Sequence, residues 1–209
     1  MSVVNEPRRR LTASARRALI EQAARDAFAE SGYQAVSMGE IATAAGVTRS
    51  VLYDYAPSKR ALFEQLLRDE HADLTARLAA SILVAEPPYE RLARALDDFV
   101  AYVDEHPIAG RVLADEPFGD EELEAVRHAL HSQTKAALAG WIANDAGDRF
   151  DAASVRGHVL IDAVYGALVG VASSRRRPRR PPRDEVVAAT LDLLWAGLAP
   201  VLNGEAAGS

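Results

Sequence analysis

The sequence predicts an all-α protein of about nine helices, and three observations support this fold class. Apolar residues recur at helical spacing along most of the 209 residues. No segment shows the sustained alternation of apolar and polar residues that is typical of a strand. Alanine is abundant and aromatic residues make up only 6% of the chain, which favours helices over sheets.

Local signals place the ends of the first three helices. Gly32 stands where a helix commonly ends, one residue past the last helical position. Ser37 and Glu40 form a Ser-x-x-Glu capping box that opens the second helix. Gly46 allows a tight turn, and Thr48 is the N-cap of the third helix. The nine expected helices span about residues 13–31, 38–45, 49–55, 58–85, 89–105, 107–116, 121–144, 151–173 and 184–202.

Proline and polar residues separate the later helices. Ser58 caps the long fourth helix, and Pro88 lies in the break that ends it. Pro107 is acceptable in the first turn of the sixth helix, where its missing N–H group is no loss. A polar turn over residues 144–150 precedes the eighth helix. The Arg- and Pro-rich segment 175–183 cannot be crossed by a helix, so the ninth helix follows it.

Composition excludes several classes of protein. The chain has no cysteine, which rules out disulfides, cysteine-ligated metals and a cysteine nucleophile. The most apolar stretch, residues 159–172, is shorter than a membrane span and is interrupted by Asp162. The N-terminus lacks a secretory pattern, so we expect a cytoplasmic protein. Motifs for nucleotide, metal or ester chemistry are absent from the sequence, and we expect neither an enzyme nor a cofactor.

The charge is distributed unevenly along the chain. Residues 1–60 carry nine Lys and Arg against six Asp and Glu, while the whole chain has a net charge of −6. The remaining residues therefore carry −9. A basic N-terminal part joined to an acidic remainder predicts that the N-terminal part meets a polyanion.

Residues 38–55 have the pattern of a helix-turn-helix. Ala42 lets the two helices approach closely, and Gly46 tolerates the positive φ of the turn. Ile41, Val47 and Leu52 are spaced to anchor the second helix. The second helix can then lie in the major groove of DNA with its first residues toward the base edges.

Two groups of residues are the candidate DNA contacts. Those at the start of the second helix are Thr48, Arg49, Ser50 and Val51, among which Arg49 can read guanine with two hydrogen bonds. Those suited to the phosphate backbone are Ser37, Tyr53, Tyr55 and Lys59. Residues 8–10, all arginine, could follow the minor groove, or they could be a solvated arm. The alternative for every helical candidate is an ordinary helix surface.

Residues 16–67 resemble the N-terminal domain of TetR-family transcriptional regulators. The resemblance rests on Leu19-Ile20, Gly32-Tyr33, Ile41-Ala42-x-x-Ala45-Gly46-Val47, Leu52-Tyr53-x-Tyr55 and Ser58-Lys59-x-x-Leu62. The chain departs from the family pattern at Ser50, where glycine is common, and at Ala56, where phenylalanine is usual. Loss of a core phenylalanine can cost about 3–5 kcal/mol unless neighbours such as Phe28 or Phe63 fill the space.

The resemblance implies a DNA-binding domain over residues 1–60 and a domain for effector binding and dimerisation over residues 61–209. It also implies a homodimer that presents two recognition helices to a pseudo-palindromic operator. The last two helices of each subunit would form the interface, and glycines at positions 157, 166 and 170 would allow a close approach. The expected interface residues are Val159, Val164, Leu168, Val171, Leu191, Leu194, Trp195, Leu198 and Val201.

By the same resemblance, a small-molecule effector enters the second domain and reduces the affinity for DNA. Residues that could line its pocket are Phe99, Tyr102, Val103, His106, Arg111, Phe118, Trp141 and Tyr165. The alternative is plain core packing. If they do line a pocket, the ligand is apolar or aromatic, with one polar or anionic group that His106 or Arg111 could meet. The sign of regulation stays open, because a repressor, an activator and an effector-independent regulator share the same DNA-binding part.

Two further features have simple alternatives. Glu124, His128 and His131 share one helix face at metal-ligand spacing. Lys135 on the same face favours solvated ion pairs, and we expect no metal. The arginines of segment 175–183 could bind a polyanion, but a solvated loop is favoured. His71 and His158 stand alone and carry no signal.

Overall fold

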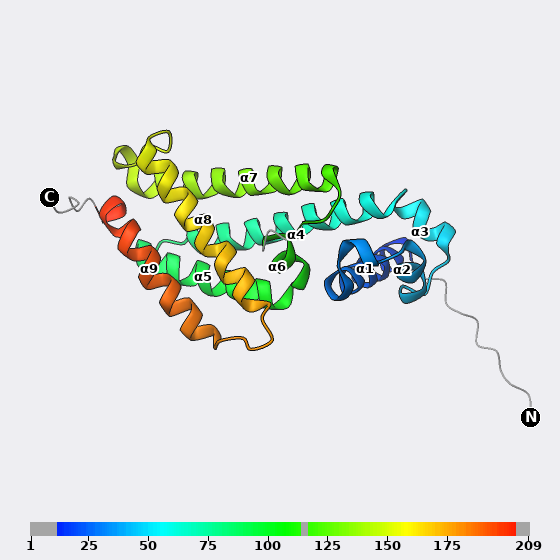
Figure 1. Cartoon of the computed structure of the whole chain (residues 1–209). Coiled ribbons are helices and arrows are strands. Elements are labelled where there is room, and N and C mark those ends of the chain that lie inside the picture. Colours follow the sequence, from blue (N-terminus) through cyan, green and yellow to red (C-terminus); the bar gives the residue numbers. More distant parts are fainter. Residues whose placement is uncertain (1–11, 114–116, 204–209) are drawn as a thin grey trace, which may run out of the picture. The chain divides into compact units, whose positions relative to one another are not determined.

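The computed structural model describes residues 12–113 and 117–203 and forms α-helices over most of them (Figure 1). The prediction of an all-α fold is confirmed, since the described ranges contain no strand. A single 3-10 turn, η1, covers Gly147–Arg149. The helices are α1 (Ala13–Ala35), α2 (Met38–Ala44), α3 (Arg49–Tyr55), α4 (Lys59–Ile82), α5 (Pro88–Glu105), α6 (Pro107–Leu113), α7 (Glu121–Ala146), α8 (Val155–Arg175) and α9 (Arg183–Asn203).

The chain divides into two compact units, and the division falls inside α4. The N-terminal unit ends at Leu66 and the C-terminal unit begins at Leu67. The boundary expected from the sequence lay at residue 60. The difference arises because the first two turns of α4 contribute Leu62, Phe63 and Leu66, all nearly fully buried, to the N-terminal unit.

The core of the N-terminal unit holds α1, α2 and α3 together. α1 packs on α2, and α2 packs on α3. The Phe63 ring lies 4.7 Å from the Phe28 ring and 5.0 Å from the Tyr33 ring, between centroids, so three aromatic rings cluster here. Ala56, at the end of α3, is 2% exposed. The small side chain at this position is therefore buried.

Gly32 interrupts α1 at the position where the sequence predicted the end of the first helix, and the short helical turn that follows it was not predicted. Its φ of 78° and ψ of 167° break the helix at a single residue, and helical structure continues to Ala35. Glycine adopts this conformation without steric cost. The following residues resume the helix, and Val36 with extended backbone ends it.

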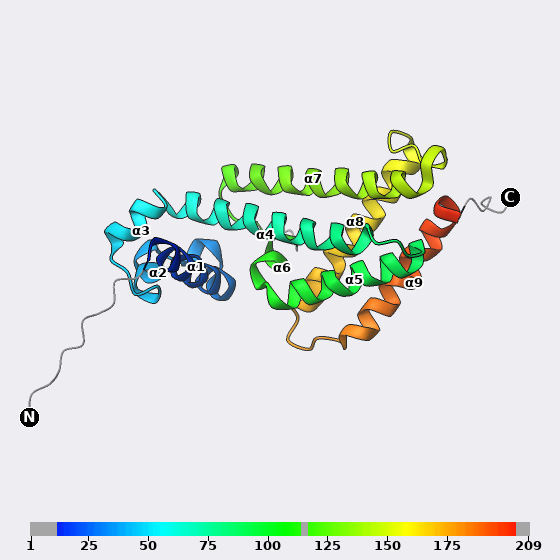
Figure 2. The ribbon, with the colours of Figure 1, turned by 180° about the vertical axis from the view of Figure 1, so that it is seen from behind.

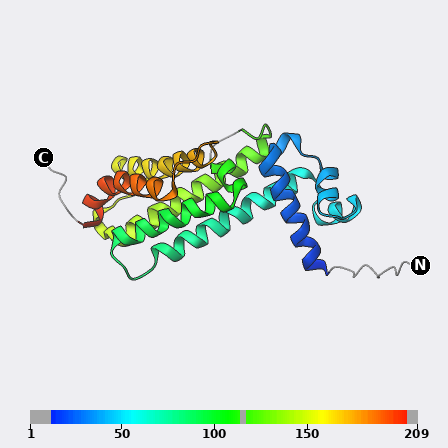
Figure 3. The same ribbon diagram turned by 90° about the horizontal axis from the view of Figure 1, so that it is seen from below.

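The C-terminal unit is a helical bundle around one apolar core. α5 packs against α6, α8 and α9, and α7 packs against α8 and α9. The backbone of α4 runs between α7 and α5 in Figure 2, and Figure 3 shows α8 and α9 side by side along one side of the unit. Core residues from five helices include Leu78, Phe99, Leu138, Val164 and Leu194.

The start of α8 differs from the expectation by one turn. Residues 151–154 form a turn, and the helix begins at Val155. The Ser154 hydroxyl accepts a hydrogen bond from the backbone N of Gly157 at 3.0 Å, which caps the helix at this residue. The helix therefore begins one turn later than expected, because the Ser154 side chain caps a free amide group of its first turn.

Candidate nucleic-acid interface and ligand cavities

The predicted helix-turn-helix is present as α2, a tight turn and α3. The Ser37 hydroxyl accepts from the backbone N of Glu40, and the Glu40 carboxylate accepts from the backbone N of Ser37 at 2.8 Å, which completes the expected capping box. Gly46 turns the chain with a φ of 65°. Ile41 and Leu52 are fully buried and anchor the two helices to the core.

The start of α3 presents polar side chains to the outside. Arg49, Ser50 and Tyr53 are exposed, with Tyr53 at 50%. Thr48 is also exposed, and its hydroxyl caps α3 by accepting from the backbone N of Val51 at 3.3 Å. The Val51 side chain is half-buried. The residues best placed for an external partner on α3 are therefore Arg49, Ser50 and Tyr53.

The Arg49 guanidinium lies over Gly39 at the start of α2. A Cβ atom added to Gly39 would lie 2.5 Å from Nη2 of Arg49. Arg49 thus lines a hollow on the surface of α2, together with Ser37, Glu40 and Thr43. The absence of a side chain at position 39 leaves room for this placement.

Tyr55 points into the protein rather than outward. Its hydroxyl donates to Glu21 Oε1 at 2.6 Å and accepts from Gln65 Nε2 at 2.7 Å, so it joins α3 to α1 and α4. Burial, followed by the hydrogen bond to the Glu21 carboxylate, raises the pKa of Tyr55 to about 12. Burial alone would raise the pKa of Glu21, but hydrogen bonds from Tyr55 and Arg17 outweigh it and lower that pKa. Sequence reasoning missed this link because Glu21 is 34 residues away from Tyr55.

Lys59 also makes its contacts inside the N-terminal unit. Its Nζ donates to the backbone oxygen of Tyr33 at 2.9 Å and to that of Gln34 at 3.3 Å. The same ammonium group lies 4.5 Å from the centre of the Tyr33 ring. Two of its three N–H bonds are thus directed at the end of α1. The expected DNA-binding arm, residues 8–10, lies outside the described residues.

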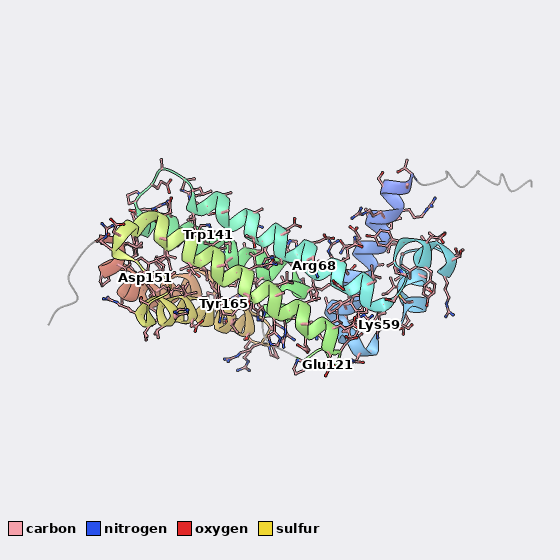
Figure 4. The ribbon with its side chains drawn as sticks, turned by 90° about the horizontal axis from the view of Figure 1, so that it is seen from above. Lys59, Arg68, Glu121, Trp141, Asp151 and Tyr165 are labelled. Atoms are coloured by element: carbon pink, nitrogen blue, oxygen red, sulfur yellow. The ribbon has the colours of Figure 1, made fainter. Side chains whose placement is uncertain are left out.

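The predicted effector residues are mostly part of the core of the C-terminal unit. Phe99, Tyr102, Val103 and Phe118 are 1–6% exposed, and Arg111 on α6 is half-buried. Figure 4 marks Trp141 on α7 and Tyr165 on α8. Trp141 lines a cavity, whereas the Tyr165 ring lies 5.4 Å from the ring of His131, which lines a different one.

Two cavities of the C-terminal unit, both lined by residues that the structure describes, bear on the effector prediction. One, of about 70 Å³, lies among the ends of α4, α5, α7, α8 and α9 and contains Trp141 in its wall. The other, of about 30 Å³, lies between α4, α6 and α7. Its lining residues are Leu67, Glu70, His71, Leu74, Ala109, Leu113, Leu130, His131 and Thr134.

Polar groups gather at the smaller cavity. The Glu70 carboxylate is buried, accepts from the Tyr102 hydroxyl at 3.0 Å and lies 2.9 Å from His106 Nδ1. The Tyr102 and His106 rings are stacked with centroids 3.9 Å apart. His71 Nε2 is 3.0 Å from the Thr134 hydroxyl. Tyr102 and His106 therefore reach this cavity through Glu70, which the sequence analysis did not single out.

His71 makes the stability of the protein depend on pH. Burial lowers its pKa below the usual 6.5, and a hydrogen bond to the Leu130 backbone opposes the shift only in part. Below pH 6.5 the unfolded chain then binds the proton more strongly than the folded one, so this contribution to stability is complete above that pH and is lost below it. Each pH unit in that window costs at most about 1.4 kcal/mol.

We expect His71→Gln to show less loss of unfolding free energy than the wild type between pH 7.5 and pH 5.5, measured by denaturant titration. His128 is exposed, so His128→Gln serves as the control and should keep the wild-type pH dependence. Equal pH dependence in the wild type and His71→Gln would contradict the assignment.

The three residues at metal-ligand spacing on α7 do not converge. Glu124 pairs with Arg127 and accepts from the backbone N of Phe118 at 2.6 Å. His128 is exposed, and Lys135 pairs with Asp162 at 2.8 Å. Within the part of the chain that the structure describes, no group of three His, Cys, Asp or Glu residues is placed to hold a metal ion.

Residues 177–182 of the Arg- and Pro-rich segment are exposed, as expected for a solvated loop, but arginines of the segment also pair with carboxylates of α5, which was not expected. Arg175 is 7% exposed and donates from Nε and Nη2 to the two oxygens of Asp104, at 2.9 and 2.7 Å. Arg180 lies 3.6 Å from the same carboxylate. Arg183 pairs with Asp97, which lies two turns before Asp104 on the same face of α5. The sequence could not reveal these pairs because more than 70 residues separate the partners.

The residues predicted for a dimer interface fall into two groups. Leu168, Leu191, Leu194 and Leu198 are 4–7% exposed, as are Val164 and Val201, and Val171 is 8% exposed, so all seven are buried in the core of this chain. Val159 is 63% exposed. Trp195 is half-buried, with its ring 5.1 Å from that of Tyr89.

Exposed apolar residues of α8 and α9 nevertheless define a surface, which we call the α8/α9 face. On α8 it comprises Val155, Val159, Ala163, Gly166 and Gly170, and on α9 it comprises Ala189, Leu193, Ala196 and Gly197. A Cβ atom added to Gly166 or Gly170 would meet nothing within 4 Å. Gly157 differs, since it packs against the backbone of Asp151 within the chain.

By length and composition, α8 and α9 are each long and apolar enough to cross a membrane, although neither contains an uninterrupted apolar run of that length. Less than half of the most apolar part of each helix is buried inside the chain. Such helices also occur in the cores and interfaces of soluble proteins, so this observation alone is weak evidence for a membrane.

Comparisons with known proteins agree with this architecture. Residues 20–66 match the family model of bacterial regulatory proteins of the tetR family. The chain is 27% identical over 197 residues to the HTH-type transcriptional activator FasR of Mycolicibacterium smegmatis, covering 92% of this chain and 87% of that protein.

Solved structures share the fold over nearly their whole length. A TetR-like transcriptional regulator from Rhodococcus sp. RHA1 has a TM-score of 0.71 and 24% identity, covering 91% of this chain and 99% of that one. The regulator FadR from Bacillus subtilis in complex with stearoyl-CoA has a TM-score of 0.71 and 20% identity, covering 87% and 98%.

Proposed function

The chain belongs to the tetR family of bacterial regulatory proteins and is a DNA-binding transcriptional regulator rather than an enzyme, and on this premise we propose that it acts in the cytoplasm as a homodimeric repressor. In this proposal residues 1–60 read a pseudo-palindromic operator, and residues 61–209 dimerise and bind a small apolar effector. The effector releases the protein from DNA.

The observation that carries the proposal is the outward face of α3. Arg49, Ser50 and Tyr53 are exposed on a helix that is anchored by buried leucine and isoleucine. This is the arrangement that places the first residues of a recognition helix against base edges. Ser37 and Lys59 are proposed as contacts to phosphate, with Lys59 using the one N–H bond that the end of α1 leaves. Tyr55 and Val51 are proposed to position α3.

Selection of genomic fragments on the purified protein at two salt concentrations tests the proposal. We expect a short inverted repeat to be enriched upstream of one or a few genes, with affinity that falls as salt rises. Failure to enrich any repeat with folded protein, both alone and with added cell extract, would refute sequence-specific binding.

The α8/α9 face supports the proposed homodimer. A two-fold axis would bring the face of one subunit onto the same face of its partner. The exposed glycines at positions 166 and 170 permit close contact between helices, and exposed Val159 and Leu193 would become buried. An uncovered apolar patch of this kind marks an interaction surface in a soluble protein.

The cavity between α4, α6 and α7 is the proposed effector site. It combines apolar walls with a few polar groups, which is typical of sites for small molecules. The structural neighbour from Bacillus subtilis is in complex with stearoyl-CoA, so acyl thioesters are the first ligands to screen, and the cavity of about 30 Å³ would have to open to admit an acyl group. An effector should lower operator affinity in proportion to its preference for the released state.

Activation instead of repression is the second candidate, because the relative FasR is named as an activator. A reporter gene behind the selected operator distinguishes the two. Deletion of the regulator should raise expression if it represses and lower expression if it activates.

Gly39→Ala tests whether the hollow on α2 holds Arg49 for base reading. The new methyl group would displace the guanidinium, and an unheld side chain pays more conformational entropy on binding DNA. We expect weaker discrimination at one operator base pair, measured with a set of single-base operator variants, and unfolding free energy within about 1 kcal/mol of the wild type.

Gly140→Ala is the matched control, since a Cβ atom at this position on α7 would meet nothing within 4 Å. It should leave operator discrimination unchanged. A Gly39→Ala protein with the wild-type base preference would show that the placement of Arg49 over α2 has no role in reading DNA.

A further inference from the structure

The larger cavity of the C-terminal unit is a second candidate site, separate from the proposed effector site. Its walls are apolar and come from five helices. Its lining residues are Ile82, Pro88, Leu92, Leu138, Trp141, Ile142, Val164, Leu198 and Leu202, together with Arg91 and Asp145. None of them lines the cavity between α4, α6 and α7. The two cavities can therefore bind different molecules.

Arg91 brings a buried polar group to this apolar wall. Its Nη2 pairs with Asp145 Oδ2 at 2.6 Å, and its Nη1 donates to the backbone oxygen of Ile82 at 3.0 Å. The two charged side chains are only 12% and 17% exposed. The remaining donor, Nε–H, is buried and has no hydrogen-bond partner. Buried donors nearly always have a partner, so one without a partner calls for an explanation.

We propose that this cavity binds a small, uncharged, largely apolar molecule whose single oxygen acceptor receives the Nε–H of Arg91. Esters, ketones and amides with short hydrocarbon groups have this chemistry. The apolar walls supply most of the affinity, and the Arg91 hydrogen bond selects molecules that carry an oxygen at the correct end.

The charge balance of the site sets the charge of the ligand. Arg91 and Asp145 already neutralise each other at 2.6 Å. An anionic ligand would add a charge without a partner to a largely desolvated site, and a cationic ligand would compete with Arg91 for Asp145. A carbonyl oxygen satisfies Nε–H and adds no net charge, so a neutral acceptor is the best match.

The volume of the cavity limits the size of the ligand. At about 70 Å³, it is roughly half of the ~150 Å³ that takes up benzene in an engineered protein core. The side chains of Ile82, Trp141 and Leu202 in its wall are only half-buried, so they can move outward more easily than core residues. A chain of about six carbons is the expected upper range, and it fits only if these side chains move outward.

Three probes that share a six-carbon chain test the proposal: methyl hexanoate, sodium hexanoate and hexylamine. Trp141 reports binding by fluorescence when Trp195, the second tryptophan of the chain, is replaced by phenylalanine. Calorimetry on the unmodified protein gives the affinities. We expect methyl hexanoate to bind at least about tenfold more tightly than either charged probe, a difference of about 1.4 kcal/mol.

Two substitutions locate the site. Arg91→Lys keeps the positive charge near Asp145 but removes Nε–H, and it should weaken methyl hexanoate binding about fivefold to tenfold. Leu138→Phe fills the cavity and should abolish binding. Arg94→Lys is the matched control, because Arg94 is exposed on the same helix and pairs with Glu86 outside the cavity. It should bind methyl hexanoate as the wild type does.

The outcomes separate clearly. Equal or tighter binding of sodium hexanoate would overturn the neutral-ligand proposal. Binding of methyl hexanoate that survives both Arg91→Lys and Leu138→Phe would place the site elsewhere, and no binding of any probe at millimolar concentration would overturn the site itself. Operator binding is measured separately, so none of these results depends on the proposed regulatory function.

Discussion

Arg49→Ala is expected to reduce operator affinity by about 1–3 kcal/mol at one base pair, because a guanidinium with two hydrogen bonds to guanine is the commonest specific contact in the major groove. The side chain is exposed at the start of α3 and lies over Gly39, so its removal should leave the core intact. Titration against single-base operator variants measures the effect. The variant should lose the wild-type preference at one position of each half-site.

The salt dependence of binding distinguishes reading a base from holding a phosphate. Loss of a base contact leaves the slope of affinity against salt nearly unchanged, whereas loss of a phosphate contact lowers it by about one. Uniform weakening on all operator variants, with a lower slope, would assign Arg49 to the backbone. Arg94→Ala, a change at an exposed arginine of α5, should alter neither quantity.

Leu193→Asp is expected to have the largest effect on assembly. Leu193 is 68% exposed on the α8/α9 face, so a charge there barely disturbs the isolated chain. In the proposed dimer the two carboxylates would be buried near the two-fold axis without partners, which is strongly unfavourable. Sedimentation should show a monomer, and operator affinity should fall by about 10²–10⁴-fold because the two half-sites are no longer bound together.

Leu83→Asp is the matched control, since Leu83 is also 68% exposed but lies between α4 and α5. It should remain dimeric and bind the operator normally. A dimeric Leu193→Asp protein would place the interface on another surface. Trp195→Asp is a less clear test than Leu193→Asp, because Trp195 contacts the Tyr89 ring inside the chain and its loss would also disturb the packing of α5 on α9.

Local sequence signals predicted the N-terminal unit well, because each signal acts within a few residues. The capping box of Ser37 and Glu40, the turn at Gly46 and the cap at Thr48 all appear as expected. The break at Gly32 also lies where the sequence predicted it, whereas the helical turn that continues to Ala35 was not predicted. Local sequence signals predict where a helix can be broken. Tertiary packing decides whether the residues after the break are helical again.

Contacts between distant residues were not predictable in the same way. Helical periodicity identifies an apolar face but does not name its partner, so the links of Tyr55 to Glu21 and of Lys59 to Tyr33 could not be foreseen. On α8 and α9 both faces are apolar. The sequence alone therefore could not separate Leu194, which is buried in the chain, from Leu193, which is exposed. One cavity arises where side chains from five helices leave space unfilled, and the other where side chains from three helices do so. Such gaps depend on how the helices pack together, which a single sequence does not specify.

The pairing of the arginine-rich segment with α5 has a consequence for how the protein meets DNA. Arg175, Arg180 and Arg183 face the carboxylates of Asp104 and Asp97, and opposite charges this close cancel beyond a Debye length of about 8 Å. An approaching duplex is thus attracted by the basic residues 1–60 and repelled by the acidic remainder. Electrostatic attraction would therefore steer diffusional encounters. It would favour orientations in which the recognition helix faces the duplex before any base contact forms. The association rate should therefore depend on salt concentration more strongly than the lifetime of the complex does.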